Sequence, residues 1–432
     1  MKQHSQFVTC VGLNHLTSPV EEREGLAFSP AELPPVLARL SERLHGAVLL
    51  STCNRTELYT TVAEEQAGSL IDVLNQEKGV RVDPSHFYLH RHEQAVRHLF
   101  RVASGIDSMV MGESQILGQV REAMSAATQA NTLDGVLSRV FHSAVSVGKR
   151  ARSETDIGRH AVSVSSAAVA LARRHMGALS DKTVLVISAG STGKLAAKSL
   201  AQSTGARILV ANRTQERAIE VAADIGPDAE GVALSRLADA LAQADIVISG
   251  TGAQGFVLGP DEVRPATAGR NGRAMLLIDI AVPRDIDPAV RELPNVLLFD
   301  IDDIEAVTKV GLDGRQAEVH RVEAIIEEEI SGFLDWWRSL DVVPVIAALR
   351  ERAETIRLSE LQRTLKRLRG LDDESRQRIE AMTVAIVKKM LDRPIARLKD
   401  GADKGLYMEA LQDLFDVHPG KAPDHGHTQR AG

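Results

Sequence analysis

The 432-residue sequence predicts a multidomain α/β protein with three regions of different secondary structure. Its length exceeds what one ordinary hydrophobic core supports, which suggests two to four domains. The first region mixes short apolar runs with helical spacing, the second alternates apolar strands with helices, and the third is almost entirely helical. The pattern therefore predicts an α+β domain, a doubly wound Rossmann-like domain and an all-α domain, in that order.

The first region, residues 1–157, contains short apolar runs that end in loops, as strands do. Phe7–Leu13 and Ala47–Ser51 are of this kind. In Glu93–Ala103, and again after Glu113, apolar residues recur three and four positions apart. This spacing indicates amphipathic helices, so the region predicts a mixed α+β domain.

The second region, residues 158–305, contains five apolar runs separated by helical segments. The runs are Thr183–Ile187, Arg207–Ala211, Ile246–Ser249, Met275–Asp279 and Val296–Phe299. Their apolar character is continuous rather than alternating, which is typical of a parallel sheet covered on both faces. This region therefore predicts the doubly wound domain.

The third region, residues 306–418, carries a long apolar stripe at helical spacing. The stripe consists of Val322, Ile326, Ile330, Phe333 and Trp337. Asp341–Pro344 interrupts the pattern, and Pro344 is predicted to begin another helix. A long helix with one apolar stripe needs a covering partner, from the same chain or a second subunit. Residues 419–432 are rich in Gly, His and polar residues and are predicted to be disordered.

The composition excludes several classes of protein. Apolar residues make up 44% and charged residues 25%, as in soluble globular proteins, and no apolar stretch is long enough for a membrane span. There is no secretory apolar block, and the two cysteines, Cys10 and Cys53, build neither a disulfide scaffold nor a metal-ligand spacing. We therefore expect a cytoplasmic protein without a metal. A net charge of −7 disfavours non-specific nucleic-acid binding, but it allows one folded RNA to dock on a local patch.

The strand Thr183–Ile187 is followed by a glycine-containing loop and then by a helical run. The loop residues are Ser188, Ala189, Gly190, Ser191, Thr192 and Gly193. Glycines at this place let the backbone approach a pyrophosphate at the helix N-terminus. Although Ser188 replaces the usual first glycine, the loop predicts a dinucleotide site.

The next strand ends before Asn212, Arg213 and Thr214. NAD enzymes usually place an acidic residue there for the ribose hydroxyls, whereas an arginine suits the 2′-phosphate of NADP. The alternative is a solvated loop arginine. The segment thus favours NADP over NAD.

Cys53 lies two residues after the strand Ala47–Ser51, at the end of a strand, where catalytic side chains commonly project into a cleft. Arg55, two residues away, offers a way to lower the pKa of the thiol, and the thiolate is the nucleophile. A lone cysteine is also common as an inert small hydrophobe, which is our interpretation of Cys10. A reactive thiol beside a nicotinamide implies reduction of an acyl group to an aldehyde through a thioester.

His98 lies on the side of its helix opposite the apolar residues, so the pattern predicts that it is not a core histidine. Two interpretations are open. It is either a solvated surface imidazole or a cleft-facing acid/base.

Seven segments together resemble the glutamyl-tRNA reductase family. They are Gly12–Val20, Leu50–Glu57, His98–Glu113, Gln115–Val120, Val147–Arg150, Ser163–Ser166 and Asp279–Pro288. The resemblance implies a catalytic domain over 1–157, an NADPH-binding domain over 158–305 and a dimerisation domain over 306–418 of a homodimer. It also implies that Cys53 attacks the ester of glutamyl-tRNA(Glu). Hydride from NADPH then releases glutamate-1-semialdehyde, in the first step of tetrapyrrole biosynthesis.

The resemblance further implies which residues hold the glutamyl group: Thr52, Asn54, Arg55, Ser108, Glu113, Ser114, Gln115 and Gln119. Ser114 stands where the family generally has proline. His98 matches a histidine that is important for activity, with its role undefined. A partner aminomutase that takes up the unstable aldehyde is a further implication.

Two other functions compete with this one. A shikimate-type NADP dehydrogenase shares the Asn-Arg-Thr loop but needs no cysteine, so Cys53→Ser would leave it active. A non-catalytic tRNA-binding homologue would yield no semialdehyde from charged tRNA and NADPH.

Overall fold

The structure is a computed structural model, and it describes most of the chain. The described residues are 7–109, 111–113, 115–158, 164–187, 191–251, 253, 255–270, 272–308, 316–368, 370–400 and 404–415. The predicted disordered tail, 419–432, lies outside them. The chain divides into two compact units, one extending to Ile330 and the other beginning at Ser331. The predicted fold class is confirmed, since the first unit contains the α+β and Rossmann-like domains and the second is helical.

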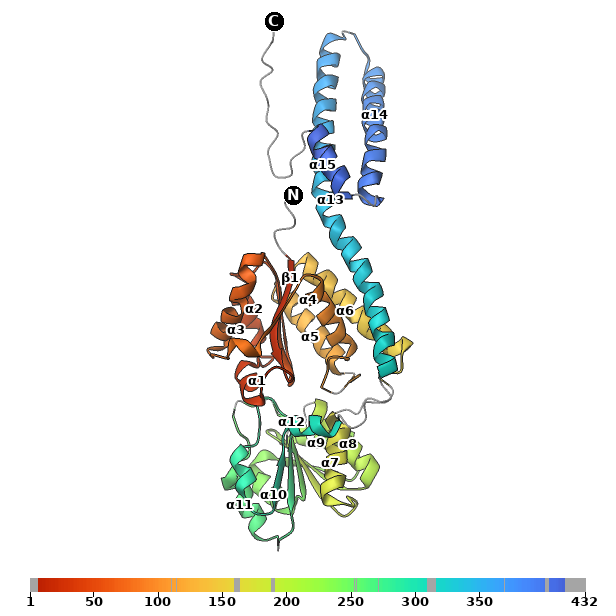
Figure 1. Ribbon diagram of the computed structural model, residues 1–432. Helices are drawn as coiled ribbons and strands as arrows, with labels where there is room; N and C mark the ends of the chain where they lie inside the picture. The colour runs from red at the N-terminus through yellow and green to blue at the C-terminus, as the bar shows by residue number, and fades with distance from the viewer. Residues whose placement is uncertain are drawn as a thin grey trace. The chain divides into compact units, whose positions relative to one another are not determined.

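The N-terminal domain is built on a four-stranded antiparallel sheet with the order β2-β3-β1-β4. Its strands are β1 (Phe7–Asn14), β2 (Ala47–Ser51), β3 (Arg55–Val62) and β4 (Tyr88–Arg91). One face is covered by α1 (Val20–Leu26), α2 (Leu33–Ser41) and α3 (Leu70–Lys78), with short 3₁₀ turns at Glu64–Ser69 and Pro84–His86. The other face packs on α4 (Glu93–Ser104), α5 (Gln115–Gln129) and α6 (Gly135–Glu154) (Figure 1).

The sequence patterns did not predict β3 and β4. All eight residues of β3 are buried, yet Arg55, Thr56, Glu57, Thr60 and Thr61 are polar. Because the strand buries polar groups on both faces, it shows neither an apolar run nor a clear alternation.

The Rossmann-like domain has a six-stranded parallel sheet with the order β10-β9-β8-β5-β6-β7. Its strands are β5 (Thr183–Ile187), β6 (Arg207–Asn212), β7 (Ala229–Ala233), β8 (Ile246–Ser249), β9 (Met275–Asp279) and β10 (Val296–Phe299). All five predicted strands are present. The sixth, β7, was missed because it is a short edge strand of mostly small residues.

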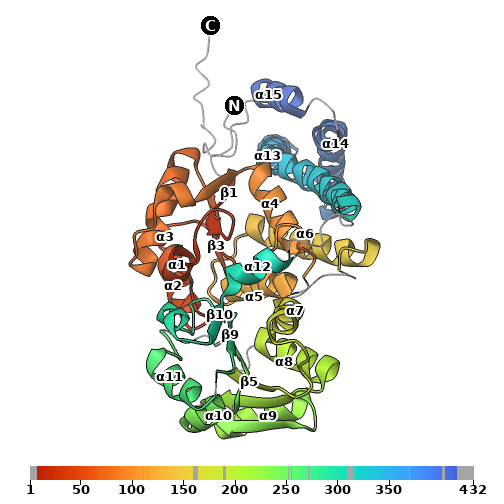
Figure 2. The same cartoon turned by 60° about the horizontal axis from the view of Figure 1, so that its bottom comes forward.

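Helices cover both faces of this sheet (Figures 1 and 2). One face carries α7 (Val164–Met176), α8 (Ser191–Thr204), α9 (Gln215–Ile225) and α12 (Ile301–Thr308). The other carries α10 (Leu237–Gln243) and α11 (Pro260–Ala268), with 3₁₀ turns at Leu234–Arg236 and Pro288–Glu292. Along β5, Val184 and Val186 face the first layer while Leu185 and Ile187 face the second. Apolar contact on both faces explains the continuous apolar runs.

The strand order places the ends of β5 and β8 side by side at the centre of the sheet. From β5 the chain proceeds outward to β6 and β7, and it then returns to β8 on the other side. In open parallel sheets, ligands bind in the crevice that this reversal leaves at the carboxyl ends of the strands.

The helical region contains α13 (Gln316–Arg367), α14 (Asp373–Asp400) and α15 (Lys404–Phe415). The predicted break at Asp341–Pro344 was wrong, because α13 continues through Pro344. A proline inside a helix costs about 3 kcal/mol. Burial of Val342, Ile346 and Leu349 around it, in a core shared with α14, offsets that cost. No described helix is long and apolar enough to span a membrane.

Candidate active site

The turn between β2 and β3 carries Cys53. The Thr52 hydroxyl accepts hydrogen bonds from the backbone N–H groups of Asn54 (3.1 Å) and Arg55 (3.2 Å), and the Thr52 N–H donates to the Arg55 carbonyl (2.8 Å). These bonds fix a tight turn with Cys53 at its corner. The thiol packs beside Val20, Met109, Val282 and Ile301.

A cavity of about 180 Å³ lies at this turn. Seven of the eight predicted substrate residues line it together with Cys53: Thr52, Asn54, Arg55, Ser108, Glu113, Gln115 and Gln119. The eighth, Ser114, lies outside the described residues. The cavity is smaller than the roughly 300–1,000 Å³ of pockets for drug-sized ligands. It has room for a small acyl group and not for a whole dinucleotide.

Two glycines shape the loop that presents Ser108 and Glu113. Gly105 and Gly112 have φ angles of 81° and 82°, in the left-handed region that disfavours side chains. The Gly112 N–H closes the loop on the Gly105 carbonyl at 2.9 Å. A Cβ atom on Gly112 would lie 2.0 Å from the Ile157 carbonyl oxygen, so the loop can pack on that residue only with glycine there.

Three polar atoms of the cavity residues are buried and, within the described part of the chain, have no hydrogen-bond partner. They are Asn54 Oδ1, Arg55 Nε and Ser108 Oγ. An unsatisfied buried polar group costs about 1–3 kcal/mol, so such groups in a cavity are ready to bind a polar ligand.

Glu57 binds and orients the Arg55 side chain. Arg55 Nη1 donates to Glu57 Oε1 at 2.7 Å, and Nη2 donates to the Asp107 carbonyl at 2.5 Å. Glu57 also accepts from the Tyr59 and Tyr88 hydroxyls at 2.6 and 2.5 Å. Burial alone would raise the pKa of Glu57, but the Arg55 guanidinium and the other donors hold this pKa far below its usual range.

His98 is the fourth partner of Glu57, with Nε2 at 2.9 Å from Oε1. Its ring lies against His90 (4.6 Å between centroids), and only 8% of the residue is exposed. The prediction that His98 is not a core histidine was therefore wrong, and so was the interpretation as a solvated surface imidazole. The ring is not among the residues that line the cavity, and an acid/base role for it stays a prediction. The polar side of α4 is buried because it faces the polar residues of β3 and β4.

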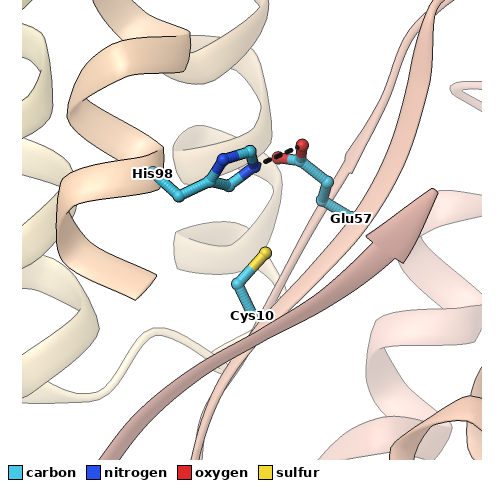
Figure 3. A group of neighbouring side chains, drawn as sticks. All are labelled: Cys10, Glu57 and His98. Carbon is cyan, nitrogen blue, oxygen red and sulfur yellow. Dashed lines mark hydrogen bonds and ion pairs between the residues drawn. The ribbon is translucent and has the colours of Figure 1, made fainter. Parts of the chain in front are cut away.

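Cys10, Glu57 and His98 form a buried group whose ligand-type atoms all lie within 4.8 Å of one another (Figure 3). These are atom types that bind metals. However, Arg55 already neutralises Glu57, and burial and the Glu57 charge raise the pKa of the Cys10 thiol well above its ordinary value. We therefore interpret these three residues as part of a hydrogen-bonded network rather than as a metal site.

The Cys53 thiol is harder to ionise than its sequence neighbours suggest. Burial and the Glu113 carboxylate raise its pKa to about 12, while Arg23 and Arg55 act in the opposite direction. As predicted, Arg55 lowers this pKa, but burial, the largest influence, and the Glu113 carboxylate outweigh it, so the net shift is upward. Glu113 is itself perturbed: burial raises its pKa to about 7, against the effects of Arg55 and Arg152. Protonation of Glu113 removes its repulsion of the thiolate, which favours ionisation of the Cys53 thiol.

The predicted dinucleotide loop is only partly described. Ser188, Ala189 and Gly190 lie outside the described residues, and α8 begins at Ser191, followed by Thr192 and Gly193. A Cβ atom on Gly250, at the end of β8, would lie 4.0 Å from the Gly193 N atom. Because Gly250 also lines the Cys53 cavity, the start of α8 and the cavity meet at the central reversal of the sheet.

At the end of β6, Asn212 is half-buried, and Arg213 and Thr214 are exposed. The Arg213 N–H donates to the Asn212 side-chain oxygen at 2.7 Å. The arginine side chain is thus accessible at the carboxyl end of the strand beside β5.

The sequence patterns missed one whole wall of the cavity. It consists of Gly250, Thr251, Ile280, Ala281, Val282 and Ile301, all from the Rossmann-like domain. Asp279 shapes this wall by accepting from the N–H groups of Ala281 (3.0 Å) and Ile286 (2.8 Å). The segment Asp279–Pro288 carried part of the family resemblance, which was the available signal, but no role was predicted for it.

Comparisons with known proteins identify the family. The model described as "Glutamyl-tRNAGlu reductase, N-terminal domain" matches residues 11–155, and its "dimerisation domain" counterpart matches 321–417. The glutamyl-tRNA reductases of Geobacter sulfurreducens and Moorella thermoacetica are 43% and 45% identical to the chain, over 95% of its length and 96% and 95% of theirs. The chain belongs to the glutamyl-tRNA reductase family. It is therefore an NADP-dependent oxidoreductase with a dimerisation domain.

The solved structure of the Methanopyrus kandleri glutamyl-tRNA reductase agrees with this assignment. It is 38% identical, has a TM-score of 0.51, and the match covers 95% of this chain and 98% of that one. Residues 170–307 match a model described as "Shikimate / quinate 5-dehydrogenase". Because the flanking regions match the reductase, this middle likeness reflects a dinucleotide-binding domain, and the shikimate-type alternative is wrong for the whole chain.

Proposed function

We propose that the chain catalyses the NADPH-dependent reduction of glutamyl-tRNA(Glu) to glutamate-1-semialdehyde, through a thioester on Cys53. This is the first step of tetrapyrrole biosynthesis. One observation carries the proposal: Cys53 lies in a cavity whose opposite wall is formed by Gly250 and Thr251, at the central reversal of the Rossmann-like sheet. Such a cavity brings a nucleophile to the place where a dinucleotide presents its reactive ring.

The glutamyl group occupies the cavity, held by Thr52, Asn54, Arg55, Ser108, Glu113, Ser114, Gln115 and Gln119. The unpartnered atoms of Asn54, Arg55 and Ser108 support this role, because they can bind the polar groups of glutamate. An arginine suits the substrate carboxylate, and here its buried guanidinium is fixed by Glu57 before any ligand arrives.

The thiol proton passes to Glu113 as the sulfur attacks the ester carbonyl. The tetrahedral intermediate then expels the 3′-oxygen of the tRNA, and Glu113 returns the proton to that oxygen. A carboxyl whose pKa lies near 7 is suited to both transfers. NADPH, when bound, supplies the hydride that converts the thioester to the aldehyde and regenerates the thiolate.

NADPH is bound by the loop and strand ends on the Rossmann-like domain. The pyrophosphate is assigned to Ser188, Ala189, Gly190, Ser191, Thr192 and Gly193, and the 2′-phosphate to Asn212, Arg213 and Thr214. The parallel sheet, the start of α8 after β5 and the exposed Arg213 all fit this group. Arg213→Ala should raise the KM for NADPH without changing the KM for NADH, and equal effects on both would contradict the assignment.

His98 acts on the substrate pocket from a distance. It binds Glu57, Glu57 binds Arg55, and Arg55 lines the cavity. We therefore assign His98 as a positioning residue rather than as the acid or base.

The chain forms a homodimer in the cytoplasm and passes its aldehyde to an aminomutase. The dimerisation region leaves apolar side chains of α13 and α14 exposed, among them Ile356, Met382, Ile386 and Met390, and a second copy would cover them.

The domain limits are proposed as 1–157 (catalytic), 158–305 (NADPH-binding) and 306–418 (dimerisation).

A charged-tRNA assay tests the function. Purified protein with glutamyl-tRNA and NADPH should yield semialdehyde, with NADH much less effective, and Cys53→Ser should abolish it. Without NADPH, mass spectrometry should detect a glutamyl adduct on Cys53 that slowly hydrolyses to glutamate. Semialdehyde formation by Cys53→Ser would refute the covalent route, and no product from the wild type would favour the non-catalytic tRNA-binding alternative.

A further inference from the structure

Arg23 is a fully buried arginine that no step proposed above uses. It lies in α1, and only 2% of the residue is exposed. Its Nη1 donates to the backbone carbonyl of Cys53 at 3.1 Å. A buried guanidinium is costly unless it is paired and hydrogen-bonded, so the contacts that Arg23 makes next to Cys53 bear on its role.

The other end of the same guanidinium binds the Rossmann-like domain. Arg23 Nη2 donates to Asp302, the second residue of α12, directly after the last strand of the parallel sheet. Ile301 of the same helix contributes to the apolar cluster that contacts Cys53. One side chain therefore connects the nucleophile's turn to the domain that carries the dinucleotide loop.

Two more residues of α1 reinforce this connection. Arg284 donates to Glu24 from its backbone N–H (2.6 Å) and from Nε (2.8 Å), and its Nη1 lies 3.0 Å from Glu21. Arg284 follows the wall residue Val282 closely in sequence. The short helix α1 is thus the part of the N-terminal domain on which the Rossmann-like domain docks.

Arg23 is also the strongest positive influence on the thiol. Among the groups that lower the pKa of Cys53, it stands before Arg55. Unlike Arg55, it has a partner carboxylate that is 39% exposed, so solvent weakens that pairing and leaves more of the Arg23 charge directed at the sulfur.

We infer that Arg23 is a positioning residue that couples docking of the dinucleotide domain, through Asp302, to the placement and activation of Cys53. With the domain docked, Asp302 holds the guanidinium against the Cys53 carbonyl, which fixes the turn and keeps a positive charge beside the thiol. With the domain released, the arginine loses this anchor. The thioester should therefore form and be reduced fastest when the dinucleotide domain is docked. The inference rests on the proposed function, which it deepens.

The first test needs no substrate. The rate of Cys53 alkylation by iodoacetamide is measured from pH 6 to 10 in the full-length wild type, Arg23→Gln, Arg23→Lys and Asp302→Asn, with mass spectrometry to confirm the modified cysteine. Arg23→Gln should slow alkylation at pH 8 by about tenfold, which corresponds to one pKa unit of the thiol. Arg23→Lys, which keeps the charge, should recover part of the rate. Arg39→Gln, at an exposed arginine of α2, is the matched control and should match the wild type.

The second test measures how the acyl-enzyme divides between two products. With charged tRNA and saturating NADPH, Asp302→Asn should raise the ratio of free glutamate to semialdehyde about threefold, since the loss of one partly exposed ion pair weakens docking only modestly. For the same reason it should slow alkylation of Cys53, but by less than Arg23→Gln does. Asp302 is exposed enough for this variant to fold even if Arg23→Gln does not.

The outcomes separate the two proposals. If Arg23→Gln and Arg23→Lys alkylate like Arg39→Gln, or if Asp302→Asn leaves the product ratio unchanged, the coupling inference is wrong. If the wild type forms no Cys53 thioester from charged tRNA, the proposed function fails instead, whatever the alkylation profiles show.

Discussion

Replacing Glu57 by glutamine should strongly destabilise the N-terminal domain. The carboxylate is completely buried and binds Arg55, Tyr59, Tyr88 and His98 at once. Glutamine has nearly the same shape but leaves the buried guanidinium of Arg55 without a counter-charge. Breaking a buried pair in this way costs about 3–5 kcal/mol. For a domain of this size each kcal/mol lowers the unfolding temperature by about 2–4 °C, so we expect a drop of roughly 6–20 °C.

The pH dependence of this loss follows from the pKa of Glu57. Its folded-state pKa lies below the unfolded value of about 4.3. The stabilisation is therefore complete above that unfolded value and is lost as the pH falls through the folded pKa. Differential scanning calorimetry should give the same decrease from pH 6 to 8 and a smaller one in acid.

The matched control is Glu64→Gln. Glu64 is 68% exposed and pairs with Arg91 at 3.4 Å, so its loss should leave the unfolding temperature nearly unchanged. The reasoning would be refuted if Glu57→Gln shifted the unfolding temperature no more than this control does.

Three further predictions concern the cavity. In Glu113→Gln, the rate of tRNA release without NADPH should lose its rise with pH through about 7, because the group that accepts the thiol proton is gone; an unchanged profile would exclude Glu113 as the base. His98→Gln should raise the KM for glutamyl-tRNA more than it lowers kcat, since it loosens Arg55 through Glu57; a pure kcat effect, measured in steady state, would contradict a positioning role. Gly112→Ala should destabilise the protein by more than about 1 kcal/mol, because its backbone is left-handed and its Cβ would overlap the Ile157 carbonyl, whereas Gly68→Ala, with open space around it, should not. Equal unfolding temperatures for the two alanine variants would contradict the predicted clash.

The parallel sheet could be predicted from the sequence because its strands are short apolar runs, buried on both faces. The spacing of apolar residues did not predict burial in those elements where polar groups are buried against one another. Glu57 and His98 look solvent-facing in any apolar pattern, yet each is the other's partner. That pairing joins residues 41 positions apart, and only the three-dimensional register of β3 and α4 reveals it.

Only one of the two walls of the cavity was predicted from the sequence. The wall from the N-terminal domain lies in segments that carry recognisable motifs, whereas Gly250 and Ile301 have no distinctive neighbours and reach the site through the topology of the sheet. The net pKa of Cys53 was mispredicted for a related reason. The positive neighbour Arg55 is visible in the sequence, but the burial of the thiol, which is the largest influence, and the nearby carboxylate of Glu113 arise only in the folded chain.

The small volume of the cavity also bears on the order of events. About 180 Å³ between the thiol and the Rossmann-like wall accommodates one small group at a time. The terminal adenosine of a tRNA and a nicotinamide ring would compete for the same approach to the sulfur. We therefore expect the two reagents to take turns, with the spent tRNA leaving before the acyl group is reduced. Double-reciprocal plots for the two substrates would then be parallel lines rather than intersecting ones.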